Sequence, residues 1–382
     1  MVFGIVLMLT LWALALSLAL YGAWVAFKHF SSTPPHLDAP FGLYPVSILK
    51  PLKGNDPGLK ENLSSFFVLD YPDYELIFSV ASENDPARFV VEGLLRQFPR
   101  VPARLIVGEV EAGINPKVNN LHRSYELAKH DLLLISDSNV RVQPSYLRRM
   151  VGHMDSGVGM VTSVISGCDS SGLGGELEMN HLNTFYSRGM VLLDALKHPC
   201  VVGKSMLFRR SVANRFGGIK TLACYLAEDY MAGEAMRKLG LRVVTASDPI
   251  EQYIGKRTLT DFWQRNVRWG RIRKAQAPLA FVVEPLLGSI VSGLLGGFAF
   301  HHLFDVSIAA FLMVHLTIWG ACDLVVGKSL RQTFHYRTPG IWCLREVLMI
   351  VLWFHIASGN TVQWRGKELT LRDGGLLALS EV

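Results

Sequence analysis

Five short apolar runs, rich in β-branched residues, alternate along the chain with longer polar stretches of helical character. Alternating strand and helix patterns predict parallel strands joined by crossover helices. Such a sheet is buried on both faces, which explains why the runs are almost continuously apolar. The sequence therefore predicts an α/β domain with a mostly parallel sheet. The runs are VSILK (46–50), YELIFSVA (74–81), ARLIV (103–107), LLLIS (132–136) and LRVVTA (241–246).

Polar residues that follow these runs are the first candidates for chemistry, because parallel sheets bind ligands beyond the carboxyl ends of their strands. Asp85 follows the second run, Lys117 and Asn119 follow the third, and Asp137 follows the fourth. A single Asp in such a place is usually a helix cap or a turn former, and Asp85 stands before a proline. Because several clusters share one predicted edge, we expect Asp85, Lys117 and Asn119 to bind substrate.

The first segment of the chain predicts a membrane anchor. Residues 2–27 are almost entirely apolar, which is long enough to cross a bilayer of about 30 Å. A cleaved signal peptide is the alternative, but it normally has a positive start and a shorter apolar run. Here Lys28 comes after the run. The positive-inside bias then places the residues that follow in the cytoplasm.

Three apolar segments near the end of the chain predict further membrane helices. Residues 279–300 and 305–322 are close to span length, and 341–357 is shorter and carries two charged residues. We expect the third either to span the membrane or to lie in its interface. A charge inside a span is costly, so Glu284 should face other helices or a polar cavity.

The stretch KRTLTDFWQRNVRWGRIRK mixes basic and aromatic residues, as interfacial amphipathic helices do. It lies directly before the C-terminal apolar segments and predicts a helix at the cytoplasmic membrane surface. The expected organisation is an anchor (1–28), a linker (29–45), a catalytic domain (46–255), an interfacial helix (256–278) and a C-terminal membrane region (279–382).

Composition excludes several other classes. The chain has five cysteines without CxxC spacing, which predicts neither a disulfide framework nor a zinc site. A net charge of +6 suits nucleic acid or an anionic membrane, and the 50% of hydrophobic residues favours the membrane. The sequence has no GxxxxGK[ST] and no GxGxxG after a strand, which disfavours P-loop kinases, ATPases and dehydrogenases.

A carboxylate pair, Glu228 and Asp229, precedes the basic aromatic stretch and suggests group transfer. A carboxylate at the mouth of a sheet can accept a proton, and Asp229 is our candidate for the general base. Glu228 is assigned the lesser role of positioning Asp229 or raising its pKa by like-charge repulsion. Arg268 and Trp269 can hold an anionic ligand with a flat face.

Asp137 is the candidate metal ligand. It follows a buried strand and precedes two small polar residues, and carboxylate oxygen suits a hard cation such as Mg²⁺ or Mn²⁺. Such a cation would bridge a diphosphate. The second Asp of a DxD motif is replaced by Asn139, so the site offers one carboxylate and one amide oxygen.

Several motifs together resemble those of the ceramide glucosyltransferases, membrane glycosyltransferases with a GT-A fold. The resemblance covers the anchor, the whole sheet domain and the EPLLGSIV region from Glu284 onward. AEDY and QRNVRW on their own are shared with the cellulose, chitin and hyaluronan synthases. The motifs are residues 46–75, GINPKVNNL (113–121), ISDSNVRV (135–142), CVVGKSM (200–206), AEDY (227–230) and QRNVRW (264–269).

The resemblance implies a role for each matching residue. Asp85 would contact the uridine, Asp137 the metal and the donor diphosphate, and Asp229 would be the catalytic base. Gln264, Arg268 and Trp269 would complete the donor and acceptor site. The implied reaction is inverting transfer of a hexose, glucose in the first place, from a UDP-sugar to the primary hydroxyl of ceramide. The implied location is a bacterial inner membrane, with several spans and the catalytic domain facing the cytoplasm.

Other acceptors and other classes stay open from the sequence. Diacylglycerol or a hopanoid could replace ceramide. A processive polysaccharide synthase must also move its product across the bilayer, and the predicted spans are few for that task. A catalytically silent membrane binding protein is the alternative outside the enzymes. The three aspartates retained together with Arg268 and Trp269 disfavour it, because a binding module needs no base.

Overall fold

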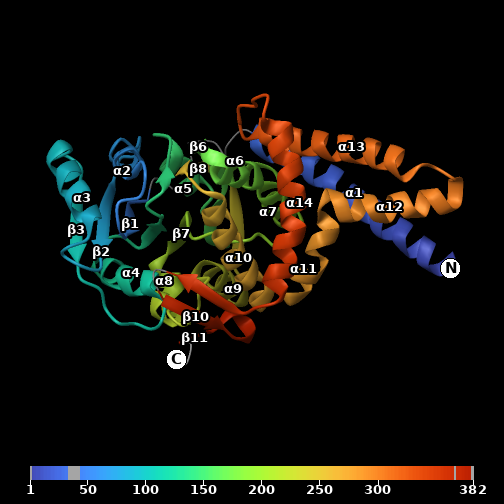
Figure 1. Ribbon diagram of the computed structural model, residues 1–382. Helices are drawn as coiled ribbons and strands as arrows, with labels where there is room; N and C mark the ends of the chain where they lie inside the picture. Colours follow the sequence, from blue (N-terminus) through green and yellow to red (C-terminus); the bar gives the residue numbers. More distant parts are fainter. Residues whose placement is uncertain (1, 33–43, 365–366, 380–382) are drawn as a thin grey trace.

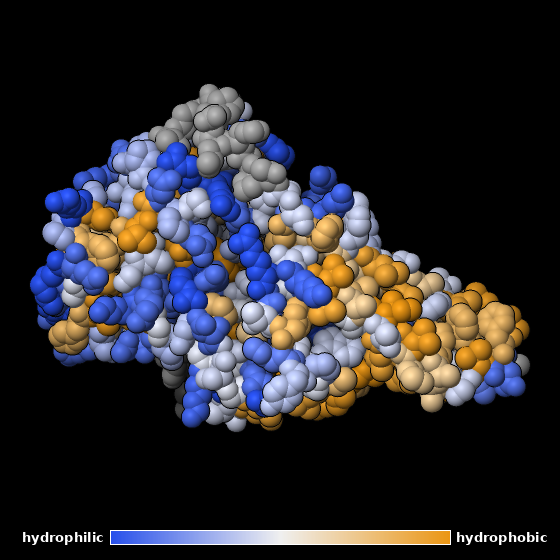
Figure 2. Space-filling view, turned by 90° about the horizontal axis from the view of Figure 1, so that it is seen from above, coloured by the Kyte–Doolittle hydropathy of each residue, from blue (hydrophilic) through white to orange (hydrophobic). Residues whose placement is uncertain are grey.

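The computed structural model describes residues 2–32, 44–364 and 367–379, and it consists of a sheet domain from which a bundle of helices projects (Figure 1). Apolar residues gather over the projecting helices, whereas polar residues cover most of the visible sheet domain (Figure 2). Most of the predicted linker, residues 29–45, lies outside the described part of the chain. The predicted domain bounds stay predictions.

The central sheet has eight strands in the order β3-β2-β1-β4-β7-β6-β8-β5. Each of the five predicted runs forms a strand, and β3, β2, β1 and β4 are parallel to one another. The predicted mostly parallel sheet is confirmed. The strands are β1 (Val46–Leu52), β2 (Tyr74–Val80), β3 (Ala103–Val107), β4 (Leu132–Ile135), β5 (Val140–Arg141), β6 (Val158–Ser171), β7 (Met206–Arg209) and β8 (Arg242–Lys256).

Helices cover both faces of the sheet, and alternate strand residues enter two separate cores. In β1, Ile48 packs into one apolar cluster and Leu49 into the other, as the two-residue period of a strand requires. The covering elements are α2 (Leu59–Phe67), α3 (Pro86–Gln97), α4 (Pro116–Leu127), α5 (Tyr146–Gly152), α6 (Gly172–His181), the π-helix η1 (Leu182–Tyr186), α7 (Ser187–Ala195), α8 (Arg210–Ala213), the 3-10 turns η2 (Asn214–Phe216) and η3 (Ile219–Leu222), and α9 (Glu228–Lys238).

The projecting bundle contains α1 (Val2–Ser31), α12 (Ser289–Phe304) and α13 (Ile308–Ser329), which pack against one another. Three helices in the described residues are long and apolar enough to cross a membrane, namely α1, α13 and α14 (Thr338–Ala357). The count rises to four if the bent pair formed by Pro278–Leu287 and Ser289–Phe304 is one span. The predicted N-terminal segment thus forms a single long helix.

The predicted continuous segment 279–300 is broken. It forms α11 (Pro278–Val283), a 3-10 turn η4 (Glu284–Leu287) and α12, with a bend of 64°. The break has a local cause, because Pro285 cannot continue a helical ladder and Gly288 is extended, with φ −95° and ψ 157°. Glu346 of α14 accepts a hydrogen bond from the backbone N–H of Ser289 at 2.8 Å, which satisfies a donor that the break exposes.

Helix α14 runs across the base of the bundle (Figure 1), and both of its ends make polar contacts with other elements. Arg337, just before its start, pairs with Glu176 of α6 at 2.9 Å. Near its other end, His355 accepts a hydrogen bond from Trp263 at 2.9 Å, and Lys274 donates to the carbonyl of Ala357 at 3.0 Å. Residues 341–357 thus belong to a helix that is long and apolar enough to span a membrane, and its placement stays a prediction.

The predicted interfacial helix forms α10 (Leu259–Gln276), which begins at a capping box between Thr258 and Asp261. A three-stranded sheet of β9 (Thr361–Trp364), β10 (Lys367–Leu371) and β11 (Leu377–Leu379), with the turn η5 (Asp373–Gly375), packs beside it. The backbone N–H of Leu377 donates to the carbonyl of Cys224 at 2.8 Å, so this sheet also supports the loop before Glu228.

Candidate active site

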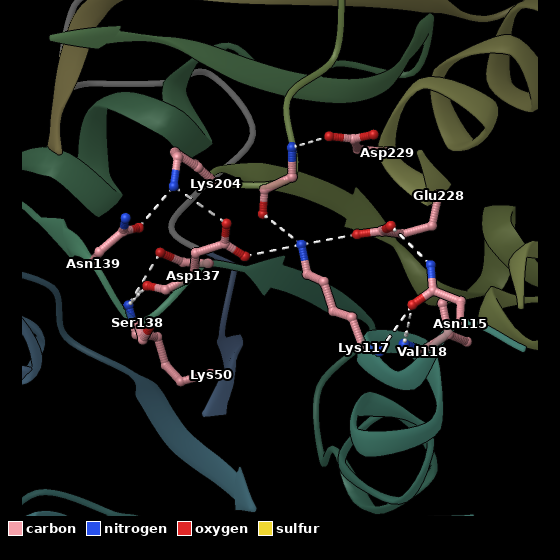
Figure 3. A network of polar contacts seen from close by, with 12 residues as sticks. Lys50, Asn115, Lys117, Val118, Asp137, Ser138, Asn139, Lys204, Glu228 and Asp229 are labelled. Carbon is pink, nitrogen blue, oxygen red and sulfur yellow. Dashed lines mark hydrogen bonds and ion pairs between the residues drawn. The ribbon is translucent and has the colours of Figure 1, made fainter. Parts of the chain in front are cut away.

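Lys117 forms ion pairs with two acidic residues that come from different elements of the sheet domain (Figure 3). Its Nζ lies 2.9 Å from Asp137 Oδ1 and 2.8 Å from Glu228 Oε1. Lys117 is in the first turn of α4, Asp137 follows β4, and Glu228 begins α9. The structure therefore brings these three predicted site residues together at the carboxyl end of the parallel strands.

Asn115 fixes the start of α4 and links it to the loop before α9. As the helix N-cap, its Oδ1 accepts the backbone N–H groups of Lys117 at 2.8 Å and Val118 at 3.2 Å. Its Nδ2 donates to the carbonyl of Tyr225 at 2.7 Å and to Glu228 Oε2 at 3.1 Å. Sequence reasoning missed Asn115, although an Asn directly before a proline is a recognisable helix start.

Asp229 lies beside Glu228, with each carboxylate oxygen held by a backbone N–H. Oδ2 accepts from Gly203 at 2.5 Å and Oδ1 from Tyr230 at 2.8 Å. Burial, together with the negative charge of Glu228, raises the pKa of Asp229 to about 6, although Lys117 and the two backbone donors oppose the shift. The group is therefore ionised near neutral pH yet basic enough to accept a proton.

The pairing of β4 with β7 places Lys204 beside Asp137. The strands are antiparallel, with Ile135 opposite Met206, so residues just after β4 meet residues just before β7. Lys204 Nζ lies 3.4 Å from Asp137 Oδ2 and 2.7 Å from Asn139 Oδ1. Sequence reasoning missed Lys204 because the short strand β7 was not recognised.

The two lysines set the charge state of this part of the site. Burial would raise the pKa of Asp137, but the positive charges of Lys117 and Lys204 hold it well below its usual range. Burial lowers the pKa of Lys204 to about 8, against the pull of Asp137. Asp137 thus stays ionised at neutral pH, while Lys204 can lose its proton in mildly alkaline solution.

Asp137 can serve as one ligand of a Mg²⁺-type cation. No group of three His, Cys, Asp or Glu residues suited to a metal occurs in the part of the chain that the structure describes. Mg²⁺, however, is often bound through one or two carboxylates, with water and substrate phosphates as its other ligands. The Asp137 side chain is 28% exposed at the strand end, which fits that mode. Lys204 would share Asp137 with the cation.

Asp85 and Asn119 both stabilise loops at this edge. Asp85 is the N-cap of α3, and its Oδ1 accepts from Ala87 N and from Gly54 N, each at 2.9 Å. The capping alternative noted from the sequence is therefore observed. Asn119 holds the preceding loop, since its Oδ1 accepts from Gly113 N at 3.1 Å and its Nδ2 donates to Gly113 O at 2.9 Å. Their predicted substrate contacts stay predictions.

The basic aromatic motif lies on α10, and its residues differ in their surroundings. Trp269 is half-buried against Tyr186, with ring centroids 5.4 Å apart, and the guanidinium of Arg265 lies 4.3 Å above its ring. Arg268 is half-buried, and Gln264 is exposed. Trp263, the other aromatic residue of the motif, is bonded to His355 of α14 as described above.

Comparisons with known proteins agree with this architecture. The sequence profile of the family described as Glycosyl transferase family 21 matches residues 7–377. Ceramide glucosyltransferase 3 of Caenorhabditis elegans is 31% identical over 336 residues, which cover 86% of this chain and 73% of that protein. The ceramide glucosyltransferase of Komagataella phaffii is 28% identical over 94% of this chain and 88% of its own length.

Among solved structures, the mannosyltransferase PcManGT from Pyrobaculum calidifontis, in complex with GDP-Man and Mn²⁺, superposes with a TM-score of 0.52. The match covers 93% of this chain and 99% of that chain at 17% identity, so it bears on the fold alone. It agrees with the GT-A fold expected from the sequence.

Proposed function

Because the chain belongs to glycosyl transferase family 21, we propose that it transfers a hexose, glucose in the first place, from a UDP-sugar to the primary hydroxyl of ceramide. The chain is a glycosyltransferase by this membership. The proposal adds the donor, the acceptor and inversion at the anomeric carbon. It draws support from relatives whose names specify ceramide glucosyltransferase and from the carboxylates and lysines at the sheet edge.

Inversion in a single displacement needs a base behind the attacking hydroxyl. Asp229 is suited to this role, because its raised pKa of about 6 makes it a better base than an ordinary carboxylate. The hydroxyl proton would pass to a carboxylate oxygen of Asp229 as the oxygen attacks the anomeric carbon. The bond from that carbon to the diphosphate breaks at the same time, and UDP leaves.

The departing diphosphate needs positive charge, and this chain supplies it from several elements. Lys204 and Lys117 flank Asp137 at the strand edge, and Arg268 would approach from α10. A Mg²⁺ or Mn²⁺ ion held by Asp137, with the Asn139 amide nearby, would supply further neutralisation when bound. Glu228 would keep Lys117 and Asp229 in place, because it contacts the lysine and adjoins the aspartate.

Other site residues are assigned to substrate binding by the family resemblance. Asp85 would contact the uridine while it caps α3, and Gln264 and Trp269 would complete the donor and acceptor site on α10. Lys117 and Asn119 belong to the same edge, Asn119 through the loop that it holds. The contacts of Asp137, Lys117 and Glu228 support a common donor site for these elements.

We also propose that α1, α12 and α13 cross the membrane and that the sheet domain faces the cytoplasm of a bacterium. Lys28 is near the C-terminal end of α1, Arg331 follows α13 and Arg337 precedes α14. These ends of the helices are the ones next to the sheet domain (Figure 1). The loop at the opposite end, 305–307, contains neither Lys nor Arg. This distribution agrees with the positive-inside rule.

The observation that carries the proposal is the position of Asp229 and Glu228 beside the Lys117–Asp137 pair. The test uses the full-length protein in lipid nanodiscs, supplied with UDP-glucose, UDP-galactose or UDP-glucuronate and with ceramide or diacylglycerol. Mass spectrometry of the lipids identifies the product, and NMR gives its anomeric configuration. We expect β-glucosylceramide; transfer only to diacylglycerol, or an α-linked product, would overturn the proposed acceptor or the inversion.

A further inference from the structure

A cavity of about 300 Å³ lies where the bundle meets the sheet domain. Its walls come from the end of α6 and η1, the bent α11–α12 segment, and α14. The bend at Gly288 turns α12 relative to α11 at this level, next to α14. The cavity therefore has a structural origin in the broken helix described above.

Part of the lining is apolar and reaches the outer surface of α14. Ile290 and Val291 of α12 and Met349 and Phe354 of α14 all line the cavity. Phe354 lines the cavity and is also 64% exposed, so the cavity reaches the outer surface of α14. On a surface that lies against lipid, such an opening admits hydrocarbon chains.

Arg345 and Glu346 also line the cavity, and they belong to a buried network of ion pairs whose charges balance. Arg345 pairs with Asp323 at 3.0 Å and with Glu346, while Arg188 pairs with the same Asp323. These two arginines and two acids have no net charge. A phosphate head group would bring a negative charge that this neutral network does not offset. An uncharged polar head group brings no such charge and only needs hydrogen-bond partners.

Another ion pair lies at the cavity, because Glu284 is one of its lining residues. Glu284 accepts two hydrogen bonds from Arg273, each at 2.7 Å, so this arginine too is neutralised. The expectation that Glu284 faces a polar cavity or other helices is confirmed. With this pair included, the three arginines and three acidic residues of these ion pairs have no net charge.

Two buried nitrogen atoms of residues at the cavity have no hydrogen-bond partner among the residues that the structure describes. They are Nδ1 of His181 and Nε of Arg345, and both residues line the cavity. Burial, followed by the charges of Arg345, Arg273 and Arg265, lowers the pKa of His181 well below its usual range. A neutral imidazole can donate or accept, and the guanidinium N–H can only donate. Together they match a carbonyl and a hydroxyl.

The cavity adjoins the part of α10 that carries the basic aromatic motif. Arg273, the partner of Glu284, lies one turn after Trp269 on this helix. Tyr186 directly follows the cavity residue Phe185 in η1, and its ring centroid lies 5.4 Å from that of Trp269. The cavity is therefore next to predicted substrate-binding residues.

We propose that this cavity binds the uncharged amide and hydroxyl backbone of the acceptor lipid, which enters from the bilayer between α12 and α14. The lipid carbonyl accepts from Arg345, a backbone hydroxyl bonds His181, and the primary hydroxyl extends past the Arg273–Glu284 pair toward Asp229. The hydrocarbon chains leave through the apolar opening. This assignment rests on the proposed function, since it gives the place of the same acceptor.

The test fills the cavity and compares the result with a matched change on the same helix. Ile290→Trp places a large ring in the cavity, whereas Leu294→Trp adds the same ring one turn further along α12, at a side chain that is 38% exposed. Full-length protein in nanodiscs is assayed for the ceramide KM and, separately, for UDP-glucose binding. We expect Ile290→Trp to raise the ceramide KM by at least about tenfold with donor binding unchanged. We expect Leu294→Trp to behave as wild type.

A second variant and a chemical probe locate the lipid directly. His181→Phe keeps the ring that stacks on Phe185 and removes both nitrogens, and it should raise the ceramide KM by roughly threefold to tenfold. A ceramide with a diazirine near its amide should label peptides from 284–291 or 345–354 in wild type and in Leu294→Trp, and not in Ile290→Trp.

The outcomes separate this assignment from the proposed function. If wild type glucosylates ceramide while both tryptophan variants keep the wild-type KM, or if the label falls elsewhere, the cavity is not the acceptor site and the proposed function stands. If wild type fails to glucosylate ceramide, the proposed function is wrong, and so is the assignment of ceramide to this cavity.

Discussion

Lys204 Nζ lies 2.7 Å from Asn139 Oδ1, at the position where a DxD motif would have its second carboxylate. The same ammonium lies 3.4 Å from Asp137, the carboxylate that we propose as the metal ligand. The Lys204 ammonium group therefore lies at the place where we expect the donor phosphate and the metal to bind. This relationship makes the metal requirement and the pH dependence of the enzyme informative.

The first prediction concerns the metal. A chelator in excess should abolish transfer by the purified enzyme, and Mg²⁺ or Mn²⁺ should restore it, because a hard cation would bridge Asp137 and the diphosphate. The measurement is the initial rate of glucosylceramide formation. Full activity in excess chelator would contradict the metal role and leave Lys117, Lys204 and Arg268 to neutralise the leaving group.

The second prediction is a bell-shaped dependence of kcat/KM on pH. Below about pH 6 the rate should fall, because protonated Asp229 cannot accept a proton. Above about pH 8 it should fall again, because Lys204 loses the charge that binds the diphosphate. Lys204→Arg should move the alkaline limb upward, since arginine stays protonated. An unchanged alkaline limb in that variant would assign the limb to another group.

The third prediction separates donor from acceptor on α10. Trp269 packs on Tyr186, which directly follows Phe185 of the proposed acceptor cavity. Trp269→Ala should therefore lower transfer to ceramide more than it lowers UDP-glucose binding, as measured by the KM for ceramide and by the Kd for the donor. Equal losses in both quantities would place Trp269 on the donor side.

The fourth prediction concerns Asn115, which caps α4 and also donates to Glu228. Asn115→Ala should lower the free energy of unfolding by about 1 kcal/mol through the lost cap and should also lower activity. Asn115→Ser keeps a capping oxygen but has no amide N–H, so it should regain stability without regaining activity. Thermal unfolding measured beside the transfer rate tests both. If Ser restored full activity, the bond to Glu228 would have no catalytic importance.

Much of the fold follows from the sequence alone. The apolar runs at β1, β2, β3, β4 and β8 are visible because a strand buried on both faces has no polar alternation. The family was also predictable from the combined motifs, and the family profile confirms it. Asp137 could be placed at the active edge because it directly follows a recognisable strand.

Other features needed the three-dimensional structure. Lys204 comes close to Asp137 only through the antiparallel strand β7, whose four residues are too short to identify by pattern. The break at Gly288 lies inside a run whose composition suits a single span, and Glu346, which stabilises it, is distant in sequence. The position of Lys204 and the break at Gly288 both depend on contacts between residues far apart in the sequence.

The central claim is that Asp229 is the general base, and the most direct test compares Asp229→Asn with Glu228→Gln. The amide keeps the shape of the carboxylate and removes its basicity, and a positioned base accelerates a reaction by about 10² to 10⁴. Asp229→Asn should bind UDP-glucose almost normally while kcat falls by at least about two orders of magnitude. If Asp229→Asn turned over near the wild-type rate while Glu228→Gln was inactive, the base would be Glu228; if neither bound donor, the pair would serve donor binding, and the mechanism proposed for Asp229 would be wrong.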